Sequence, residues 1–465
     1  MGTDTGPLAR QIVDLVVVHA AELLICAAGR GTDGRGVRGA GLAALEVIAD
    51  GAIAVAGDRV VAVGPTAEIL AAYDGDRVVD ATGKVVSPGL VDPHTHLVFA
   101  GSRHDEWEDR VLGRPVRDLD HGIRWTVERT RAASTEDLRR RAMGDLDEAL
   151  AHGTTTLETK SGYGLDRDTE LRLLQVAAGL EHPVDVVSTY LGAHVLPAEY
   201  AGRREEYVDL VIDLLPEAAG LAEYCDVCAD PVGFTREECA RIAAAARRHG
   251  LGIRVHADQT GSAGGTAFAV EKRAASVDHF EYATDADLVA LAASNTVAVL
   301  LPGVTHHMLE MVPGVHADGS PSAASAPPKA YLPTLVRRLV DLGACVALAT
   351  DYNPGTCPSL SMQTAMQLAA RLFRLGYAEI WHMATINAAI ALDRGHDRGS
   401  LEVGKLADLV VWAVPEHGMI INRFGTNLVE TVVKSGRIVI DRDPPHPASS
   451  TAAAGSRSSG REDPQ

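Results

Sequence analysis

The central part of the chain repeats one pattern, in which a short apolar run is followed by a longer stretch with helical spacing. The first run, 87–97, ends in Asp92-Pro93-His94-Thr95-His96-Leu97. Seven further strand-like runs lie at 154–159, 184–191, 224–229, 252–256, 275–279, 297–301 and 346–350, and helical periodicity with polar faces occupies 135–152, 235–249 and 283–294. Strands that alternate with helices are typical of parallel β/α units. The sequence therefore predicts an α/β protein with a (β/α)8 TIM-like barrel, whose active site lies at the carboxyl ends of the strands.

The two ends of the chain predict a second, smaller domain. Strand-like runs at 15–18, 52–55, 59–64 and 77–80 are separated by glycine and aspartate turns, and the runs 407–412 and 431–439 have the same character. We expect both ends to build one small β-sandwich from residues 1–85 and 396–442. The barrel then occupies 86–395, and the low-complexity tail 443–465 is expected to be disordered.

Charge and cysteine usage narrow the class of partner. The 465 residues carry a formal net charge of -19, which argues against nucleic acid and anionic membrane surfaces because both require basic patches. No segment reaches membrane-spanning length without charges. The six cysteines lie in mostly apolar surroundings, so we expect a reduced, cytoplasmic protein in which Cys225 and Cys228 are buried strand thiols. A homodimer is left open as the assembly state.

Histidine and aspartate recur where the predicted strands end: His94 and His96 on the first, His194 on the third, His256 on the fifth, His279 on the sixth and Asp351 on the eighth. Strand side chains alternate, so His94 and His96 face the same side. An isolated His-x-His is more often a pair of core or solvated histidines. Several imidazoles on one barrel rim are hard to explain as core filling, and imidazole and carboxylate ligands suit Zn²⁺ or Fe²⁺ better than Mg²⁺ or Ca²⁺.

A metal ion held in this way predicts hydrolytic chemistry. It lowers the pKa of bound water toward ~7 and supplies hydroxide at neutral pH. Asp351 is expected to contact the metal and take the proton of the water, while His279 polarises the attacked carbonyl or stabilises the oxyanion. The sequence thus favours hydrolysis at a carbonyl or amidine carbon.

Two motifs resemble a known superfamily. The stretch Pro88-Gly89-Leu90-Val91-Asp92-Pro93-His94-Thr95-His96, together with Gly404-Lys405-Leu406-Ala407-Asp408-Leu409-Val410, is similar to the metal-dependent amidohydrolases. Within these, the pieces at 97–103, 158–165, 191–194, 256–259, 299–303 and 350–356 resemble the imidazolonepropionase family of histidine degradation. The most specific pieces are Lys160-Ser161-Gly162-Tyr163-Gly164-Leu165 and Asp351-Tyr352-Asn353-Pro354-Gly355-Thr356.

The resemblance implies an activity and a set of site residues. The activity is hydrolysis of 4-imidazolone-5-propanoate, a small anionic heterocycle, to N-formimidoyl-L-glutamate. One Zn²⁺ or Fe³⁺ per chain is implied, with His94, His96, His256 and Asp351 as its ligands. Catalytic roles are implied for Asp351, His279 and Gln259, and substrate contacts for Arg103, Tyr163, His194, Gln259, Asn353, Gly355 and Thr356. An arginine fork suits a propionate carboxylate.

Departures from the family pattern keep alternatives open. Val116 stands where the family usually has tyrosine, and the segments 118–123 and 305–308 differ from the family, as does the sequence from Cys225 to Asp230. The long segment 312–329 has the composition of a loop or lid. The alternatives are a related cyclic amidohydrolase or aminohydrolase with another heterocyclic substrate, and a non-catalytic barrel. Without the resemblance, a surface salt bridge to Asp105 or Glu106 is the preferred interpretation of Arg103, and the alternative for Tyr163 is ordinary turn packing.

Overall fold

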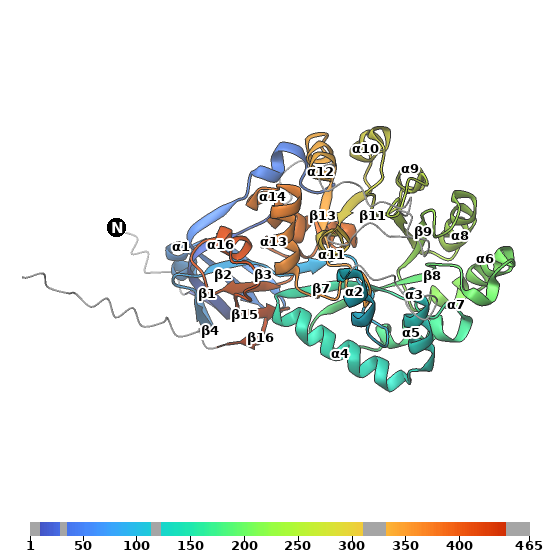
Figure 1. Cartoon of the computed structure of the whole chain (residues 1–465). Helices are drawn as coiled ribbons and strands as arrows, with labels where there is room; N and C mark the ends of the chain where they lie inside the picture. Colours follow the sequence, from blue (N-terminus) through green and yellow to red (C-terminus); the bar gives the residue numbers. More distant parts are fainter. Residues whose placement is uncertain (1–9, 28–34, 113–121, 310–331, 443–465) are drawn as a thin grey trace, which may run out of the picture.

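The computed structural model describes residues 10–27, 35–112, 122–309 and 332–442 (Figure 1). Two sheets organise them, a barrel of parallel strands and a mixed sheet built from the two ends of the chain. In Figure 1 the mixed sheet lies to the left, where early (blue) and late (red) strands are side by side, and the barrel with its helices lies to the right. The predicted segments 312–329 and 443–465 fall outside the described residues, as does Val116.

The barrel strands are β6 (Leu90–Asp92), β7 (Thr154–Lys160), β8 (Asp185–Ala193), β9 (Tyr224–Ala229), β10 (Gly252–Ala257), β11 (Ser276–His279), β12 (Val297–Leu300) and β13 (Val346–Leu348). They pair in chain order and in parallel. Each one falls on a run that the sequence predicted to be a strand, so the predicted barrel is confirmed.

The barrel closes just beyond the carboxyl ends of β6 and β13. Asp351 N donates to His94 O at 3.0 Å, and His96 N donates to Tyr352 O at 2.8 Å. The buried Asp92 carboxylate strengthens this seam by accepting from Thr350 N at 3.0 Å. Closure therefore occurs at the histidines and the aspartate that the sequence singled out.

The helices of the described residues are α1 (Thr66–Ala72), α2 (His104–Val111), α3 (Ile123–Ala132), α4 (Thr135–Ala151), α5 (Arg167–Ala178), α6 (Arg204–Asp213), α7 (Leu215–Ala218), α8 (Arg236–Arg248), α9 (Gly265–Glu271), α10 (Asp285–Ala292), α11 (Pro302–Leu309), α12 (Leu332–Asp341), α13 (Met362–Phe373), α14 (Tyr377–Ala384), α15 (Ile386–Ala391) and α16 (His417–Asn422), with short 3₁₀ helices η1 (Gly39–Ala43) and η2 (Ala198–Tyr200). Most of α4 to α12 surround the barrel (Figure 1). Helix starts follow the capping rules: Thr235 and Glu238 form a capping box at α8, and the Ser134 side chain caps α4.

The terminal sheet contains β1 (Gln11–Leu24), β2 (Val47–Ala56), β3 (Arg59–Pro65), β4 (Tyr73–Asp80), β5 (Val85–Pro88), β14 (Leu409–Trp412), β15 (Val429–Lys434) and β16 (Arg437–Asp441). Its order is β16-β15-β14-β5-β1-β2-β3, and β4 pairs with β1. The strand period of two sends Leu15 and Val17 into one apolar cluster, and Val16 and Val18 into another. Both ends of the chain thus build one β-domain, as predicted, and the eight strands of this expected β-sandwich are connected in one mixed sheet. The boundaries 85/86 and 395/396 stay predictions.

Ionic contacts join the sheet to the barrel. Lys434 of β15 lies with its Nζ 2.7 Å from an Asp185 oxygen on β8 and 2.8 Å from Asp408 Oδ2. The Lys434 side chain is 4% exposed, so this is a buried lysine between two carboxylates, remote in sequence from the predicted site. Arg398 also binds Asp185 and reaches the Thr156 hydroxyl at 3.0 Å.

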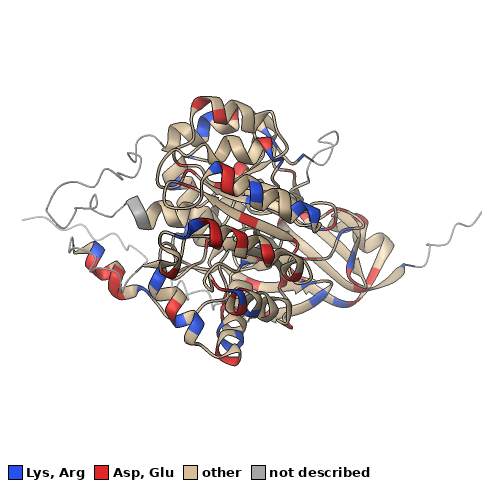
Figure 2. Cartoon of the chain, turned by 90° about the vertical axis from the view of Figure 1, so that its right-hand side faces the viewer, with Lys and Arg blue, Asp and Glu red and all other residues tan. Residues whose placement is uncertain are grey.

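The surface around the barrel carries charges of both signs. Figure 2 shows basic and acidic residues interspersed along the helices around the barrel. Within the described ranges, no helix is long and apolar enough to cross a membrane. All six cysteines are buried and carry free thiols, and Cys225 and Cys228 lie on β9 as predicted. The cytoplasmic location and the homodimer stay predictions.

Candidate metal centre

Three histidines and an aspartate meet at the carboxyl end of the barrel. Ring nitrogens of His94, His96 and His256 lie within 4.8 Å of one another. Asp351 Oδ1 lies 3.3 Å from His94 Nε2 and 3.4 Å from His96 Nε2. All four side chains are buried. The structure therefore brings together the four residues that the family resemblance gave as metal ligands.

The atoms that face the centre of this group lack hydrogen-bond partners. Among the described residues, His94 Nε2, His256 Nε2 and Asp351 Oδ1 are buried and make no hydrogen bond. A buried polar atom without a partner costs on the order of 1–3 kcal/mol, so such a cluster requires a compensating ligand. Imidazole nitrogens and a carboxylate oxygen are the donor set of Zn²⁺ and of iron. The residues present therefore fit a metal ion.

Two further carboxylates orient the histidines from below. His94 Nδ1 lies 2.7 Å from Asp278 Oδ2, and His256 Nδ1 lies 3.0 Å from Asp226 Oδ1. A histidine that donates through Nδ1 presents the lone pair of Nε2 on its other side. Asp226 and Asp278 thus turn both rings toward the centre. No sequence motif marks either residue, because each lies inside a strand.

Burial and the neighbouring carboxylates shift the pKa values of these side chains in different directions. Burial and Lys160 depress the pKa of His94, but Asp278 and Asp351 outweigh them and raise it to about 9. Burial dominates at His256 and lowers its pKa to about 4 despite Asp226. The Asp351 pKa lies well below its usual value, because His94 and His96 overcome the effect of burial. The carboxylates therefore favour a cation at this point of the barrel.

His279 stands beside the four candidate ligands. Its Nε2 lies 3.8 Å from Asp351 Oδ2, and its Nδ1 lies 3.7 Å from Glu281 Oε1. Burial lowers the pKa of His279, but Glu281 and Asp351 reverse this and raise it. The backbone turns sharply here, since His279 and the next residue, Phe280, have φ values of 78° and 58°. The ring is thereby aimed at the centre rather than along the strand.

Tyr163 and His194 form an aromatic wall next to His96. The His194 ring stacks on His96 with centroids 5.3 Å apart, and the Tyr163 ring lies 5.5 Å from each. His194 Nδ1 lies 2.9 Å from Gly162 O, so it donates there and leaves Nε2 as an acceptor. Burial and the neighbouring His96 lower the pKa of His194 well below its usual value, which keeps the ring neutral.

Glu170 shapes the loop that carries Tyr163, although no sequence motif marks this residue. This buried carboxylate on α5 accepts hydrogen bonds from the backbone N–H groups of Gly162, Gly164 and Leu165 at 2.8–3.1 Å. Gly162 has φ +99°, and a Cβ there would lie 3.0 Å from His194 Nδ1. The glycine is needed both for the turn and for the close approach of His194.

Arg103 is held by Glu106. The arginine donates from Nε and Nη2 to the two Glu106 oxygens, each at 2.7 Å, and Glu106 also accepts from Arg110 at 2.6 Å and from Gly122 N at 2.7 Å. The salt bridge that the sequence offered as the alternative for Arg103 is therefore present.

The loop after β13 brings Gly355 against Arg103. A Cβ at Gly355 would lie 2.0 Å from Arg103 Nη1, so a side chain here would displace the guanidinium group. The Asn353 side chain is used inside the loop: Oδ1 accepts from Gly355 N at 2.8 Å and Thr356 N at 2.7 Å, and Nδ2 donates to Thr356 Oγ1 at 2.8 Å. This Asx-type turn fixes the backbone that carries Gly355 and Thr356.

Gln259 lies in the loop after β10. Its backbone N–H donates to Asp230 Oδ2 at 2.8 Å, and Thr260 N donates to the same oxygen at 2.8 Å. Asp230 closes the Cys225–Asp230 segment, where the sequence departs from the family pattern. Although this segment differs from the family pattern, its Asp230 carboxylate fixes the loop that carries Gln259.

Comparison with known proteins agrees with this geometry. The sequence profile of the Amidohydrolase family matches residues 85–439, and that of the Imidazolonepropionase-like composite domain, bacteria, matches 51–75. The imidazolonepropionase of Symbiobacterium thermophilum is 41% identical over 441 residues, which cover 92% of this chain and 98% of that protein. The imidazolonepropionase of Alkaliphilus metalliredigens is 38% identical, with 93% and 99% covered. The chain belongs to the imidazolonepropionase family.

Solved structures of more distant amidohydrolases share the fold. An adenosine deaminase from Xanthomonas campestris with bound zinc superposes with a TM-score of 0.62 at 19% identity, covering 94% of this chain and 95% of that chain. A 5-methylcytosine deaminase from Klebsiella pneumoniae superposes with a TM-score of 0.66 at 18% identity, covering 92% and 98%. These likenesses concern the fold, while membership of the imidazolonepropionase family comes from sequence.

The segments that depart from the family pattern are only partly described. Residues 118–121 lie outside the described ranges, whereas Gly122 donates to Glu106 as stated above. In segment 305–308, the His307 ring stacks on Trp107 of α2 with centroids 5.3 Å apart. Burial and the nearby Arg110 lower the pKa of His307 to about 4, so its ring is neutral. This segment therefore packs beside the Glu106 helix.

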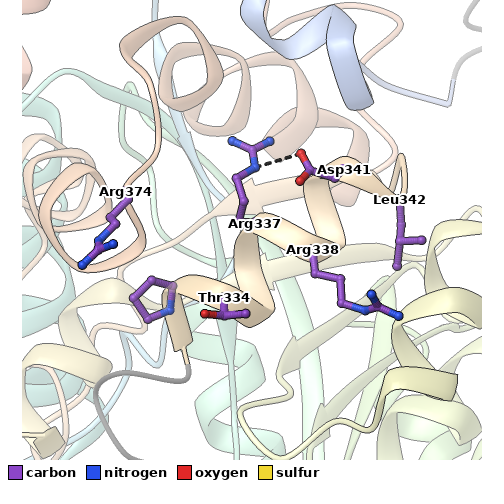
Figure 3. A pocket seen from close by; sticks show the side chains of 7 residues that line it. Thr334, Arg337, Arg338, Asp341, Leu342 and Arg374 are labelled. Carbon is purple, nitrogen blue, oxygen red and sulfur yellow. Dashed lines mark hydrogen bonds and ion pairs between the residues drawn. The ribbon is translucent and has the colours of Figure 1, made fainter.

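A cavity of about 550 Å³ lies away from these residues, along α12 (Figure 3). Three arginines line it, but two are already paired: Arg337 with Asp341 at 2.9 Å, and Arg338 with Asp285 at 2.9 Å. None of the predicted site residues lines this cavity. This cavity is therefore separate from the candidate metal centre of this member of the imidazolonepropionase family.

The Glu106 cluster predicts a pH-dependent contribution to stability. Burial raises the pKa of Glu106, but Arg103 and Arg110 outweigh it and lower the pKa to about 2. A lowered carboxyl pKa stabilises the folded state above the unfolded value of ~4.3, and this stabilisation is lost as the pH falls toward 2. Glu106→Gln should therefore reduce the free energy of unfolding more at pH 7 than at pH 3.

Urea unfolding of both proteins at the two pH values measures this difference. Glu205→Gln is the matched control, since the Glu205 side chain is 72% exposed and pairs with Arg241 on the surface. Its effect should stay within about 0.5 kcal/mol at either pH. If the difference in free energy of unfolding between wild type and Glu106→Gln is as large at pH 3 as at pH 7, the ionised Glu106 carboxylate does not stabilise the fold in this way.

Proposed function

We propose that the chain hydrolyses 4-imidazolone-5-propanoate to N-formimidoyl-L-glutamate. The observation that carries the proposal is the buried group of His94, His256 and Asp351, whose unpartnered atoms converge beside a neutral His194. Relatives at 37–41% identity over most of their length are named imidazolonepropionases. The substrate class is therefore a small planar heterocycle with a carboxylate side chain.

We propose one Zn²⁺ or Fe³⁺ as the resident metal, held by His94, His96, His256 and Asp351. The donor set supports this assignment, because three imidazoles and one carboxylate suit these ions better than the all-oxygen shells of Mg²⁺ or Ca²⁺. The Xanthomonas campestris adenosine deaminase of the same fold was crystallised with bound zinc. When bound, the ion supplies a nucleophile at neutral pH by lowering the pKa of water.

Asp351 and His279 then act on the water and on the ring. Asp351 Oδ2 lies on the side of His279, at 3.8 Å from its Nε2, where it can accept the proton of the attacking water. His279, whose pKa is raised by Glu281 and Asp351, donates a hydrogen bond to the ring carbonyl and stabilises the charge that develops on its oxygen. Asp351 returns the proton to the leaving ring nitrogen.

The surrounding residues hold the substrate. His194 Nε2 accepts from a ring N–H, while Tyr163 packs against the heterocycle and offers its hydroxyl. Arg103, fixed by Glu106, presents its Nη1 edge next to Gly355 to the propionate carboxylate. Gln259, Asn353 and Thr356 complete the contacts from their loops, with Gln259 near the reacting carbon.

The direct test is turnover of freshly prepared imidazolone propionate by metal-replete protein. Loss of the ring chromophore and appearance of N-formimidoyl-L-glutamate are expected. Absence of turnover by protein that contains one equivalent of metal would refute the substrate assignment. Release of ammonia from another heterocycle in the same assay would then favour a related aminohydrolase, and a metal content far below one equivalent would favour a non-catalytic barrel.

Asp351→Asn is predicted to abolish turnover while the fold persists. The amide keeps the volume of the side chain but removes the charge that the metal requires and the acceptor for the proton. We expect kcat to fall by at least about a thousandfold, with an unchanged circular dichroism spectrum. Asp397→Asn, whose carboxylate pairs with Arg398 outside the barrel mouth, is the matched control. Retention of wild-type kcat in Asp351→Asn would place the proton acceptor elsewhere.

Gly355→Ala is predicted to weaken substrate binding. The added Cβ would lie 2.0 Å from Arg103 Nη1, so the guanidinium must leave its place. Because Arg103 binds a part of the substrate that does not react, KM should rise by about tenfold or more while kcat changes less. Gly144→Ala on α4 is the control, since its Cβ would meet nothing within 4 Å. A fall in kcat alone would contradict the role of Arg103 as the carboxylate clamp.

A further inference from the structure

Directly beneath the candidate metal centre, the barrel interior is charged rather than apolar. The charged side chains with 0% exposure here are Glu158 and Lys160 on β7, Asp226 on β9, Arg254 on β10 and Asp278 on β11. Barrel interiors are usually filled by branched apolar side chains. A buried ion cluster contributes little net stability compared with apolar packing, so its presence at this place points to the site above it.

Lys160 occupies the middle of this cluster. Its Nζ lies 2.7 Å from Glu158 Oε1, 2.9 Å from Asp226 Oδ2 and 3.8 Å from Asp278 Oδ2. Within the described part of the chain, no other lysine or arginine has an ion-pair contact with both Asp226 and Asp278. Arg254 reaches Asp278 at 3.9 Å, but its main hydrogen bonds go to the carbonyls of Ala391 and Pro93.

The same two carboxylates hold the two histidines. Asp226 binds His256 Nδ1 at 3.0 Å through Oδ1, and Asp278 binds His94 Nδ1 at 2.7 Å through Oδ2. One ammonium group thus connects the supports of two candidate ligands that lie on different strands. His96 lacks such a support among the described residues: its Nδ1 is unpartnered, and its ring rests on His194.

The position of Lys160 has a geometric consequence for the histidines. Its ammonium group lies 2.9 Å from Asp226 Oδ2 and 3.8 Å from Asp278 Oδ2, so it attracts both carboxylates from the side away from the candidate metal centre. Asp226 Oδ1 and Asp278 Oδ2 contact Nδ1 of His256 and of His94. A contact at Nδ1 fixes the orientation of an imidazole ring, so the Nε2 atoms of both rings face the centre. Without the ammonium group the two carboxylates would lose the charge that holds them in place, and both rings would lose their support.

We propose that Lys160 is a positioning residue of the metal centre, whose ammonium group couples Asp226 to Asp278 so that His256 and His94 both present Nε2 to the metal. The inference rests on the metal site of the proposed function. It adds a residue that does not touch metal or substrate and acts through two carboxylates and two rings.

The test compares Lys160→Met with Lys434→Met. Lys434 is also a buried lysine between two carboxylates, Asp185 and Asp408, but it lies at the junction with the terminal sheet. After both variants are shown to be folded, the dissociation constant for Zn²⁺ is measured by competition with a chromophoric chelator. Lys160→Met should bind zinc about tenfold or more weakly, and Lys434→Met within twofold of wild type.

A spectroscopic signature separates positioning from a loss of stability. The Co²⁺-loaded protein has visible absorption bands that report the ligands of the ion. These bands should change in Lys160→Met and stay unchanged in Lys434→Met. Zinc affinity of Lys160→Met within threefold of wild type, together with unchanged cobalt bands, would overturn the proposal.

If Lys160→Met does not fold, the test uses the zinc affinity of three other variants: Asp226→Asn, Asp278→Asn and the double variant. Coupling through one ammonium group predicts that the double variant weakens zinc binding by much less than the product of the two single effects. If the double variant weakens zinc binding by a factor within twofold of the product of the two single factors, the proposal is overturned. If the variants show this coupling but the metal-loaded wild-type protein does not turn over imidazolone propionate, the proposed function is refuted and the role of Lys160 is not.

Discussion

The hydrogen bonds that close the barrel between the segments after β6 and β13 are the contacts on which the site depends. Asp351 N–H binds the His94 carbonyl, and His96 N–H binds the Tyr352 carbonyl. The same seam fixes the distance between the two histidines of the first strand and the aspartate of the last. Without it, residues separated by more than 250 positions in the sequence would have no reason to share one centre. The hydrogen bonds that close the barrel therefore also bring the candidate metal ligands together.

Below this seam, polarity is arranged in layers. The rim holds imidazole rings, the next layer holds Asp226 and Asp278, and beneath them lie Lys160 and Arg254. Each layer satisfies the one above, since an unpartnered buried charge would be far more costly than a paired one. Three of the buried atoms without a hydrogen-bond partner in the described residues, His94 Nε2, His256 Nε2 and Asp351 Oδ1, belong to the candidate ligands. These three atoms are therefore available to a metal ion.

Much of this arrangement could be predicted from the sequence. Periodicity found every barrel strand, because apolar runs alternate with helical stretches and the polar ends stand out at His256 and Asp351. The supports of these residues could not be found in the same way. Asp226 and Asp278 lie within strands, Glu170 lies within a helix, and periodicity tells which way a side chain faces but not which distant group it meets. Arg103 shows the same limit: the sequence offered both a carboxylate clamp and a salt bridge, and only the fold shows that Glu106 fixes it next to Gly355.

The chain leaves the barrel rim through backbone conformations that L-residues rarely adopt. Asp258, His279, Phe280 and Asp351 all have φ between 50° and 78°, and each follows or ends a barrel strand. Such a conformation costs about 1 kcal/mol or more per residue, and it persists only where neighbouring contacts fix it. Those contacts are present: Phe280 N donates to Ala257 O at 2.8 Å, and Tyr282 N donates to Asp258 O at 3.0 Å. A less strained exit would continue the alternation of the strand and direct the side chains of His279 and Asp351 away from their present meeting point. The strain is therefore part of how a regular barrel places these two side chains next to each other.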